Sequence, residues 1–272
     1  MCDKFAPIGV FDSGVGGLTV VREIMRQIPN ERIVYFGDTA RVPYGGKSKE
    51  TIIRYSRQII RFLMTKKVKA IVVACNTASA LALEEIEKEI DIPIIGVVKP
   101  GAKEAVVTTK NKKIGVIGTE ATIGSMLYSE YIHMQDEEAK VYGKACPLFV
   151  PLVEENWLKD PVTYEVARRY LEELKGYDVD TLILGCTHYP LLRSTIGEVM
   201  GDKVSLVNPA YETAKSLNEL LEQKGIKNTS VCDNSYKYEF YVSDIAKKFQ
   251  AFAESILPNR ISPATRINIE EY

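Results

Sequence analysis

The 272-residue sequence has no excess of positive charge and no long apolar run. A formal net charge of −1 gives no broad positive field to hold a phosphate backbone, so we expect no nucleic-acid partner. No apolar run approaches the roughly 18 residues of a membrane span, and the first residues lack the apolar core of a signal peptide. We therefore expect a cytoplasmic protein that does not contact membranes.

The sequence also lacks any Cys-x-x-Cys pair. Its five cysteines are widely scattered, at Cys2, Cys75, Cys146, Cys186 and Cys232. This odd number and spacing disfavour a disulfide framework and a zinc knuckle, so we expect free thiols and no metal site. Cysteine behaves as a small apolar residue, and we interpret Cys2, Cys146 and Cys232 as ordinary core or surface residues.

What the sequence does contain is an internal repeat. Residues 71–77 and 182–188 each read as a short aliphatic run, a small residue, a cysteine and then hydrogen-bonding side chains. Residues 8–11 and 114–117 form a second pair of aliphatic runs, followed by Asp12-Ser13-Gly14 and by Gly118-Thr119. The two pairs have similar offsets along the chain, which one duplication explains.

Aliphatic runs alternate with stretches of helical periodicity, which predicts parallel sheets covered by helices. We expect two similar parallel-sheet α/β domains related by a pseudo-twofold, with the active site in the cleft between them. A strand at 92–98 that breaks at Lys99-Pro100-Gly101 suggests a domain crossing. The tail after residue 208 has no counterpart in the first half. The predicted domains are therefore 1–98 plus 208–272, and 99–207.

Ligands bind beyond the carboxyl ends of strands in open parallel sheets. The polar residues expected there are Asp12, Ser13, Cys75, Asn76, Cys186, Thr187 and His188. A cysteine near a helix start has its thiolate favoured by the helix dipole. If the halves face each other, Cys75 and Cys186 lie on opposite faces of one substrate carbon, a geometry that inverts a stereocentre.

Other nearby residues admit more than one interpretation. The glycines at 14, 16 and 17 do not fit a dinucleotide-binding spacing. Asp12 suits an ammonium partner or a plain helix N-cap, and His188 suits a role in orienting or ionising Cys186. In the loop 37–46, Tyr44 and neighbouring amides are candidates to line the cleft. We assign no role to His133. For Glu154 and Glu155 a weak role in the site remains an alternative, and we prefer solvent exposure.

Four segments, 10–17, 37–45, 73–78 and 184–190, resemble the signature segments of bacterial glutamate racemases, and the resemblance extends from about residue 7 to 255. It implies cofactor-independent interconversion of L- and D-glutamate, supplying D-glutamate for peptidoglycan, and a homodimer. The implied catalytic residues are Cys75 and Cys186, assisted by Asp12 and His188. The implied substrate contacts are Asp12, Ser13, Tyr44, Gly45, Asn76, Thr77, Thr187 and His188.

Three alternatives remain open at this stage. The thiol pair does not fix the length of the substrate, so a racemase acting on aspartate or another acidic amino acid is the nearest alternative. A small-anion binding module with structural cysteines belongs to a different class. A pyridoxal-dependent enzyme is the third, although no lysine site for that cofactor is apparent in the sequence.

Overall fold

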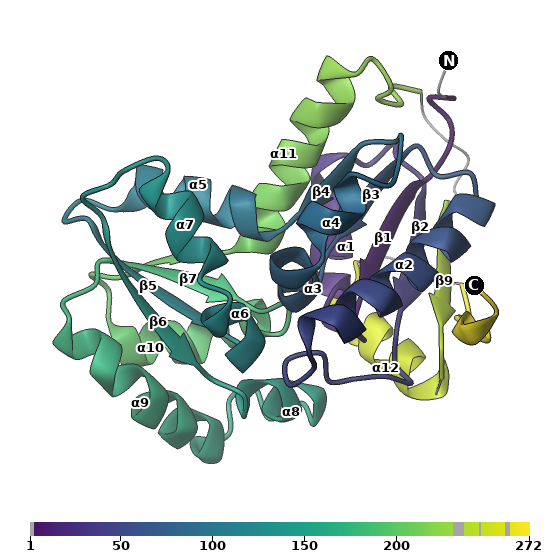
Figure 1. The fold of residues 1–272 in the computed structure, drawn as a ribbon. Coiled ribbons are helices and arrows are strands. Elements are labelled where there is room, and N and C mark those ends of the chain that lie inside the picture. Colours follow the sequence, from purple (N-terminus) through teal and green to yellow (C-terminus); the bar gives the residue numbers. More distant parts are fainter. Residues whose placement is uncertain (1–2, 231–236, 245, 259–261) are drawn as a thin grey trace.

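The computed structural model describes residues 3–230, 237–244, 246–258 and 262–272, which form two parallel β-sheets covered by helices (Figure 1). The larger sheet has the strand order β10-β9-β2-β1-β3-β4, and the smaller one has the order β6-β5-β7-β8. Every strand pairing in both sheets is parallel. The predicted fold class, two parallel-sheet α/β units, is confirmed.

The larger sheet is built largely from buried aliphatic runs. Its strands are β1 (Ile8–Asp12), β2 (Ile33–Gly37), β3 (Ala70–Val73), β4 (Ile94–Gly96), β9 (Tyr238–Val242) and β10 (Thr265–Arg266). Every residue of β1, β2 and β3 is buried, as expected for strands with helices on both faces. The helices around this sheet are α1 (Leu18–Gln27), α2 (Lys49–Thr65), α3 (Asn76–Leu81), α4 (Leu83–Glu87), α11 (Pro209–Gln223) and α12 (Ala246–Ile256).

The smaller sheet repeats the central part of the larger one. Its strands are β5 (Lys113–Gly118), β6 (Lys140–Ala145), β7 (Thr181–Gly185) and β8 (Ser205–Val207). The order β6-β5-β7-β8 matches β2-β1-β3-β4, so the duplication inferred from two strand pairs extends to four. The elements around it are α5 (Val98–Thr108), α6 (Glu120–Gly124), α7 (Leu127–His133), α8 (Phe149–Glu154), α9 (Pro161–Gly176), η1 (Tyr189–Leu192) and α10 (Arg193–Met200).

The tail of the chain returns to the larger sheet, as predicted. β9 pairs with β2, and β10 pairs with β9. A short 3-10 helix, η3 (Ile269–Glu271), packs against α2. The chain passes between the two sheets twice, through α5 and α11, which lie against each other (Figure 1). The domain boundaries near 98 and 208 stay a prediction.

One local prediction is wrong. The expected strand over 92–98 ends at Gly96. Lys99, Pro100 and Gly101 lie in the first turn of α5, where the sequence alone predicts an irregular segment after the strand. Proline is tolerated there because the first-turn N–H groups have no partner within the helix. Helix α9 begins at Pro161 with Asp160 as its N-cap, since the Asp160 carboxylate accepts a hydrogen bond from the Val162 N–H at 2.8 Å.

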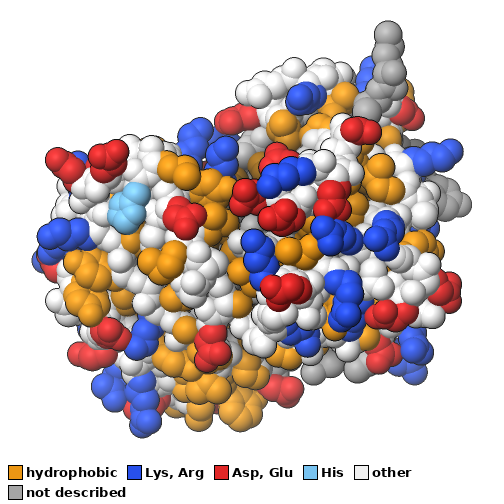
Figure 2. All heavy atoms as spheres, viewed as in Figure 1, with side chains coloured by type: hydrophobic (Ala, Val, Ile, Leu, Met, Phe, Trp, Pro, Cys, Tyr) orange, Lys and Arg blue, Asp and Glu red, His pale blue; other side chains and the backbone are white. Residues whose placement is uncertain are grey.

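The described surface agrees with the expectation drawn from composition. Lys and Arg alternate with Asp and Glu over the face seen in Figure 2, with no extended field of one sign. Among the described residues, no helix is long and apolar enough to cross a bilayer. Cys75, Cys146 and Cys186 are free thiols, and Cys146 is fully buried as interpreted, whereas Cys2 and Cys232 lie outside the described residues.

Candidate active site

A cavity of about 330 Å³ receives residues from both halves of the chain, a volume typical of small-molecule sites. Cys75 and Cys186 both line it. So do seven other predicted site residues, namely Ser13, Tyr44, Gly45, Asn76, Thr77, Thr187 and His188. Asp12 does not line the cavity but lies fully buried beside it. The structure therefore brings the predicted residues together in one place.

Cys75 follows β3 and is the N-cap of α3, where its Sγ accepts a hydrogen bond from the Ala78 N–H at 3.5 Å. The Ser13 Oγ is 3.6 Å from the same sulfur. Burial, followed by the nearby Asp12 carboxylate, raises the pKa of Cys75 to about 12. At neutral pH Cys75 is therefore a protonated thiol, which is a proton donor.

Asp12 is the last residue of β1, and its Oδ2 accepts the Gly14 N–H at 3.0 Å. Helix α1 has Gly17 as its N-cap, so the alternative interpretation of Asp12 as a plain helix N-cap does not hold. Burial raises the pKa of Asp12, while the His188 charge and backbone N–H groups oppose that rise. A buried carboxylate at the edge of the pocket is suited to a cationic partner.

Cys186 follows β7, and its Sγ lies 3.8 Å from Nδ1 of His188. The other ring nitrogen of His188, Nε2, lies 3.1 Å from Oε1 of Glu154. Glu154 lines the cavity and is half-buried, so our expectation of solvent exposure is wrong for Glu154, although Glu155 is exposed. The Glu154 carboxylate, at the end of α8, lies beside the histidine, a contact between distant segments that helix and strand periodicity does not reveal.

The electrostatics of His188 follow from these contacts. Burial alone would lower its pKa, but hydrogen bonds to Cys186 and Glu154 and the charge of Asp12 outweigh burial and raise the pKa to about 10. His188 is therefore an imidazolium at neutral pH. In this form it can pass a proton to the Cys186 thiolate, and the neutral imidazole that remains can take one back.

Since the folded-state pKa of His188 lies above its unfolded value of about 6.5, protonation stabilises the fold. We predict that this stabilisation is complete below about pH 6.5 and disappears as the pH rises toward about 10. Urea unfolding of the wild type and of His188→Asn at several pH values measures it. The difference in unfolding free energy should shrink as pH rises; a constant difference would contradict the assignment.

The neutral polar residues of the pocket are held by contacts between the two halves. Oδ1 of Asn76 accepts a hydrogen bond from the Tyr128 hydroxyl at 2.7 Å, and Oγ1 of Thr77 lies 2.9 Å from Oγ1 of Thr119. Thr119 also lines the pocket, and we did not predict it as a site residue. The repeat contained the signal, because Gly118-Thr119 is the counterpart of Asp12-Ser13.

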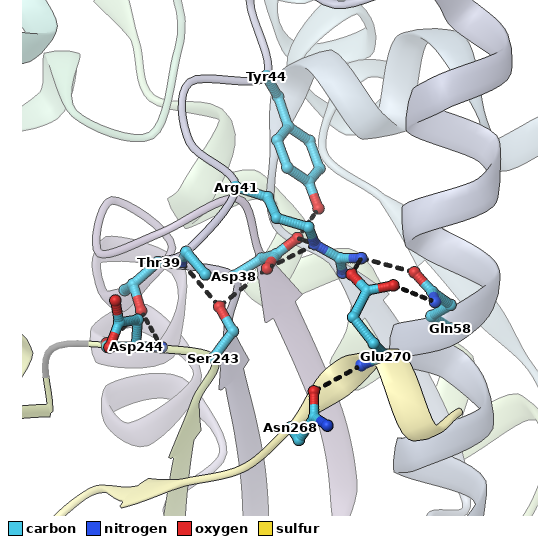
Figure 3. A network of polar contacts seen from close by, with 10 residues as sticks. Asp38, Thr39, Arg41, Tyr44, Gln58, Ser243, Asp244, Asn268 and Glu270 are labelled. Atoms are coloured by element: carbon cyan, nitrogen blue, oxygen red, sulfur yellow. Dashed lines mark hydrogen bonds and ion pairs between the residues drawn. The ribbon is translucent and has the colours of Figure 1, made fainter.

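Tyr44 lines the pocket, and its hydroxyl is engaged in a contact within the same loop. It donates a hydrogen bond to the buried Asp38 carboxylate (Figure 3). The backbone at Tyr44 and Gly45 therefore remains as the candidate for substrate contact. A side chain at Gly45 would meet the Thr119 Cβ at 2.8 Å, so glycine allows the loop to approach the other half.

Gly16 shows the same close approach at the other cysteine. A Cβ at this position would lie 2.3 Å from Thr187 Oγ1 and 2.5 Å from His188 Nδ1. We predict that Gly16→Ala displaces both side chains, costing about 1–3 kcal/mol of stability and most of the activity. The matched control is Gly46→Ala, where nothing lies within 4 Å. Equal melting temperatures and rates for the two variants would contradict this packing.

Taken together, the fold and the pocket define a duplicated α/β protein in which each half supplies one thiol to a shared cavity. Within this class the sequence can be placed further. A model of the Asp/Glu/Hydantoin racemase family matches residues 8–217, and the chain belongs to that family.

Several known proteins are similar to this chain over nearly its whole length and theirs. A glutamate racemase of Geobacter metallireducens is 46% identical over 263 residues, covering 97% of each chain. The crystal structure of a glutamate racemase isoform from Bacillus anthracis superposes with a TM-score of 0.91 at 42% identity, covering 97% of this chain and 98% of that one. A glutamate racemase of Francisella tularensis in complex with D-glutamate gives a TM-score of 0.91 at 38% identity, covering 99% and 100%.

Proposed function

We propose that this chain is a cofactor-independent glutamate racemase that uses Cys75 and Cys186 as its two proton-transfer groups. The observation that carries the proposal is that these thiols, one from each half of a duplicated fold, line a single cavity. The choice of glutamate rests on its relatives, which are named glutamate racemases, one of them solved with D-glutamate. The proposed domains, 1–98 plus 208–272 and 99–207, place one thiol on each.

In the proposed reaction, one cysteine as thiolate removes the proton from Cα, and the electron pair delocalises into the adjoining carboxylate. The opposite thiol then donates its proton to the other face of the planar carbanion and becomes the thiolate. For the reverse direction the two sulfurs exchange roles. The raised pKa of Cys75 keeps this thiol protonated, so that it can act as the donor. A substrate ammonium group beside Asp12 would offset the carboxylate charge that disfavours the Cys75 thiolate.

The pocket suits a substrate with two carboxylates, although no Lys or Arg is among the described residues that line it. Apart from the imidazolium of His188, binding therefore falls to neutral donors, for which we propose the backbone N–H groups at Tyr44 and Gly45 and the polar side chains of the pocket. The latter are Ser13, Asn76, Thr77, Thr119 and Thr187. Such preorganised donors also stabilise the charge that develops on the carboxylate during proton removal.

We further propose that the product, D-glutamate, supplies peptidoglycan synthesis in the cytoplasm, and that the enzyme acts as a homodimer. Both proposals come from the family resemblance. The homodimer predicts a molar mass in solution near twice the 30.5 kDa of one chain. Light scattering of the purified protein measures that mass directly.

The first experiment is racemisation of purified protein followed by circular dichroism, with no pyridoxal phosphate added. Equal concentrations of L-glutamate and L-aspartate are compared. We expect loss of the L-glutamate signal and a much slower reaction with L-aspartate. Faster turnover of L-aspartate would favour the aspartate racemase alternative, and activity only after addition of pyridoxal phosphate would contradict the cofactor-independent mechanism.

A further inference from the structure

The loop after β2 reaches the pocket from an anchor that lies outside it. We define residues 38–46 as the pocket loop; its far end supplies Tyr44 and Gly45 to the cavity. Its near end is held by a polar network that includes side chains from beyond residue 237 (Figure 3). These two parts of the chain are distant in sequence, and the network joins them.

Asp38 lies at the centre of this network and is fully buried. Its carboxylate accepts hydrogen bonds from the Tyr44 hydroxyl, from Arg41 Nε at 2.8 Å and from Ser243 Oγ at 2.9 Å. A buried carboxylate requires a cationic partner, and Arg41 provides it. The same carboxylate thus fixes the Tyr44 ring and the Arg41 side chain.

Arg41 extends the network from Asp38 to the helix α2 and to η3. Its Nη1 donates to Gln58 Oε1 at 2.5 Å and to Glu270 Oε1 at 3.0 Å, while its guanidinium stacks 3.9 Å above the centre of the Tyr55 ring. The side chain is only 10% exposed. Lysine carries the same charge, but it lacks the planar guanidinium group, whose several N–H groups make these contacts at the same time.

The residues beyond 237 also hold the start of the pocket loop through its backbone. Ser243 Oγ accepts the Ala40 N–H at 2.8 Å, and Thr39 Oγ1 accepts the Asp244 N–H at 2.9 Å. Glu270 is itself held near α2, because the neighbouring Ile269 is buried in the core. The anchor is therefore part of the packed fold.

From these contacts we infer that Arg41 is a positioning residue for substrate binding. Glu270 holds Arg41, and Arg41 together with Ser243 holds Asp38, which fixes the placement of Tyr44 and Gly45. The inference rests on the proposed function. Neither Arg41 nor Glu270 is among the residues that line the cavity. The two thiols follow β3 and β7, outside the pocket loop, so a disturbed anchor affects substrate binding more than proton transfer.

Two variants test the anchor against a matched control. Arg41→Lys keeps the charge beside Asp38 but loses the planar guanidinium group. Glu270→Ala removes the contact between Glu270 and Arg41 and leaves the one between Arg41 and Asp38. The control is Glu89→Ala. It breaks an ion pair with Arg57 of α2, in which Arg57 Nη2 lies 2.5 Å from Glu89 Oε1. Each variant is measured for thermal unfolding, for KM and kcat with L-glutamate, and for amide hydrogen exchange.

We expect KM to rise about 10-fold in Arg41→Lys and about 2- to 3-fold in Glu270→Ala, with kcat little changed. Amide exchange in peptides covering 38–46 should be faster in both variants than in Glu89→Ala. A KM in Arg41→Lys equal to that of the control, or a fall in kcat at unchanged KM, would overturn the inference. The exchange measurement needs no substrate, so it tests the anchor even if the wild type fails to racemise glutamate.

Discussion

Replacing either Cys75 or Cys186 with alanine reduces racemisation by at least about 10³-fold, because each variant lacks one of the two groups that move the proton. The two cysteines are 5% and 6% exposed, and alanine leaves only a small change of volume at either position. The variants should therefore fold, and they should still bind glutamate. Circular dichroism of the enantiomers follows the rate, and calorimetry follows the binding.

The matched control is Cys146→Ala, since Cys146 is also a buried free thiol but does not line the cavity. Its rate should stay near that of the wild type. Each single variant retains one thiol, so it should still exchange the α-proton of one enantiomer with solvent without inverting it. The two variants should act on opposite enantiomers. Racemisation by either variant at the Cys146→Ala rate would exclude the two-thiol mechanism.

Replacing His188 with asparagine lowers kcat by about 10²-fold, because the imidazolium 3.8 Å from Cys186 then no longer assists proton transfer at that sulfur. Glu154→Gln should have a smaller effect of about 10-fold, since Glu154 contacts only the far nitrogen of the ring. The control is His133→Asn. His133 is the other histidine of the chain, and its ring bonds the Ala139 carbonyl. Its replacement should leave kcat unchanged.

The His188 variant has a further signature. Enantiomers have equal free energies in water, so kcat/KM must fall equally in both directions. The slower proton transfer at Cys186 should be visible in the primary deuterium isotope effects. These should differ between the two directions and be larger for the enantiomer whose α-proton Cys186 removes. Isotope effects that remain equal in both directions, together with an unchanged kcat, would show that His188 has no part in proton transfer.

The central strands and the cysteine positions could be predicted from the sequence because both are local. Fully buried runs such as β3 and β7 are continuous aliphatic segments, and a polar residue after each must lie at the carboxyl edge of its own sheet. The repeat of cysteine after strand also indicated that the halves correspond. These features depend on strand periodicity alone.

Features that depend on contacts between distant segments could not be predicted in this way. Pro100 reads as a break in isolation, yet it lies in the first turn of α5, where Gly101 packs against Pro209 of α11. Glu154 reads as a solvent-exposed residue until His188 is seen beside it. The Tyr44 hydroxyl donates to Asp38, which also accepts a hydrogen bond from Ser243, a residue 205 positions later in the chain.

The most direct test of the two-thiol proposal is racemisation of L-glutamate in deuterated water, stopped at early times. Two separate proton carriers predict solvent deuterium at Cα of the newly formed D-glutamate and little in the recovered L-glutamate, because the donor thiol exchanges with solvent before it acts. Equal early labelling of both enantiomers would mean that a single shared base serves both faces, and would contradict the mechanism proposed for Cys75 and Cys186.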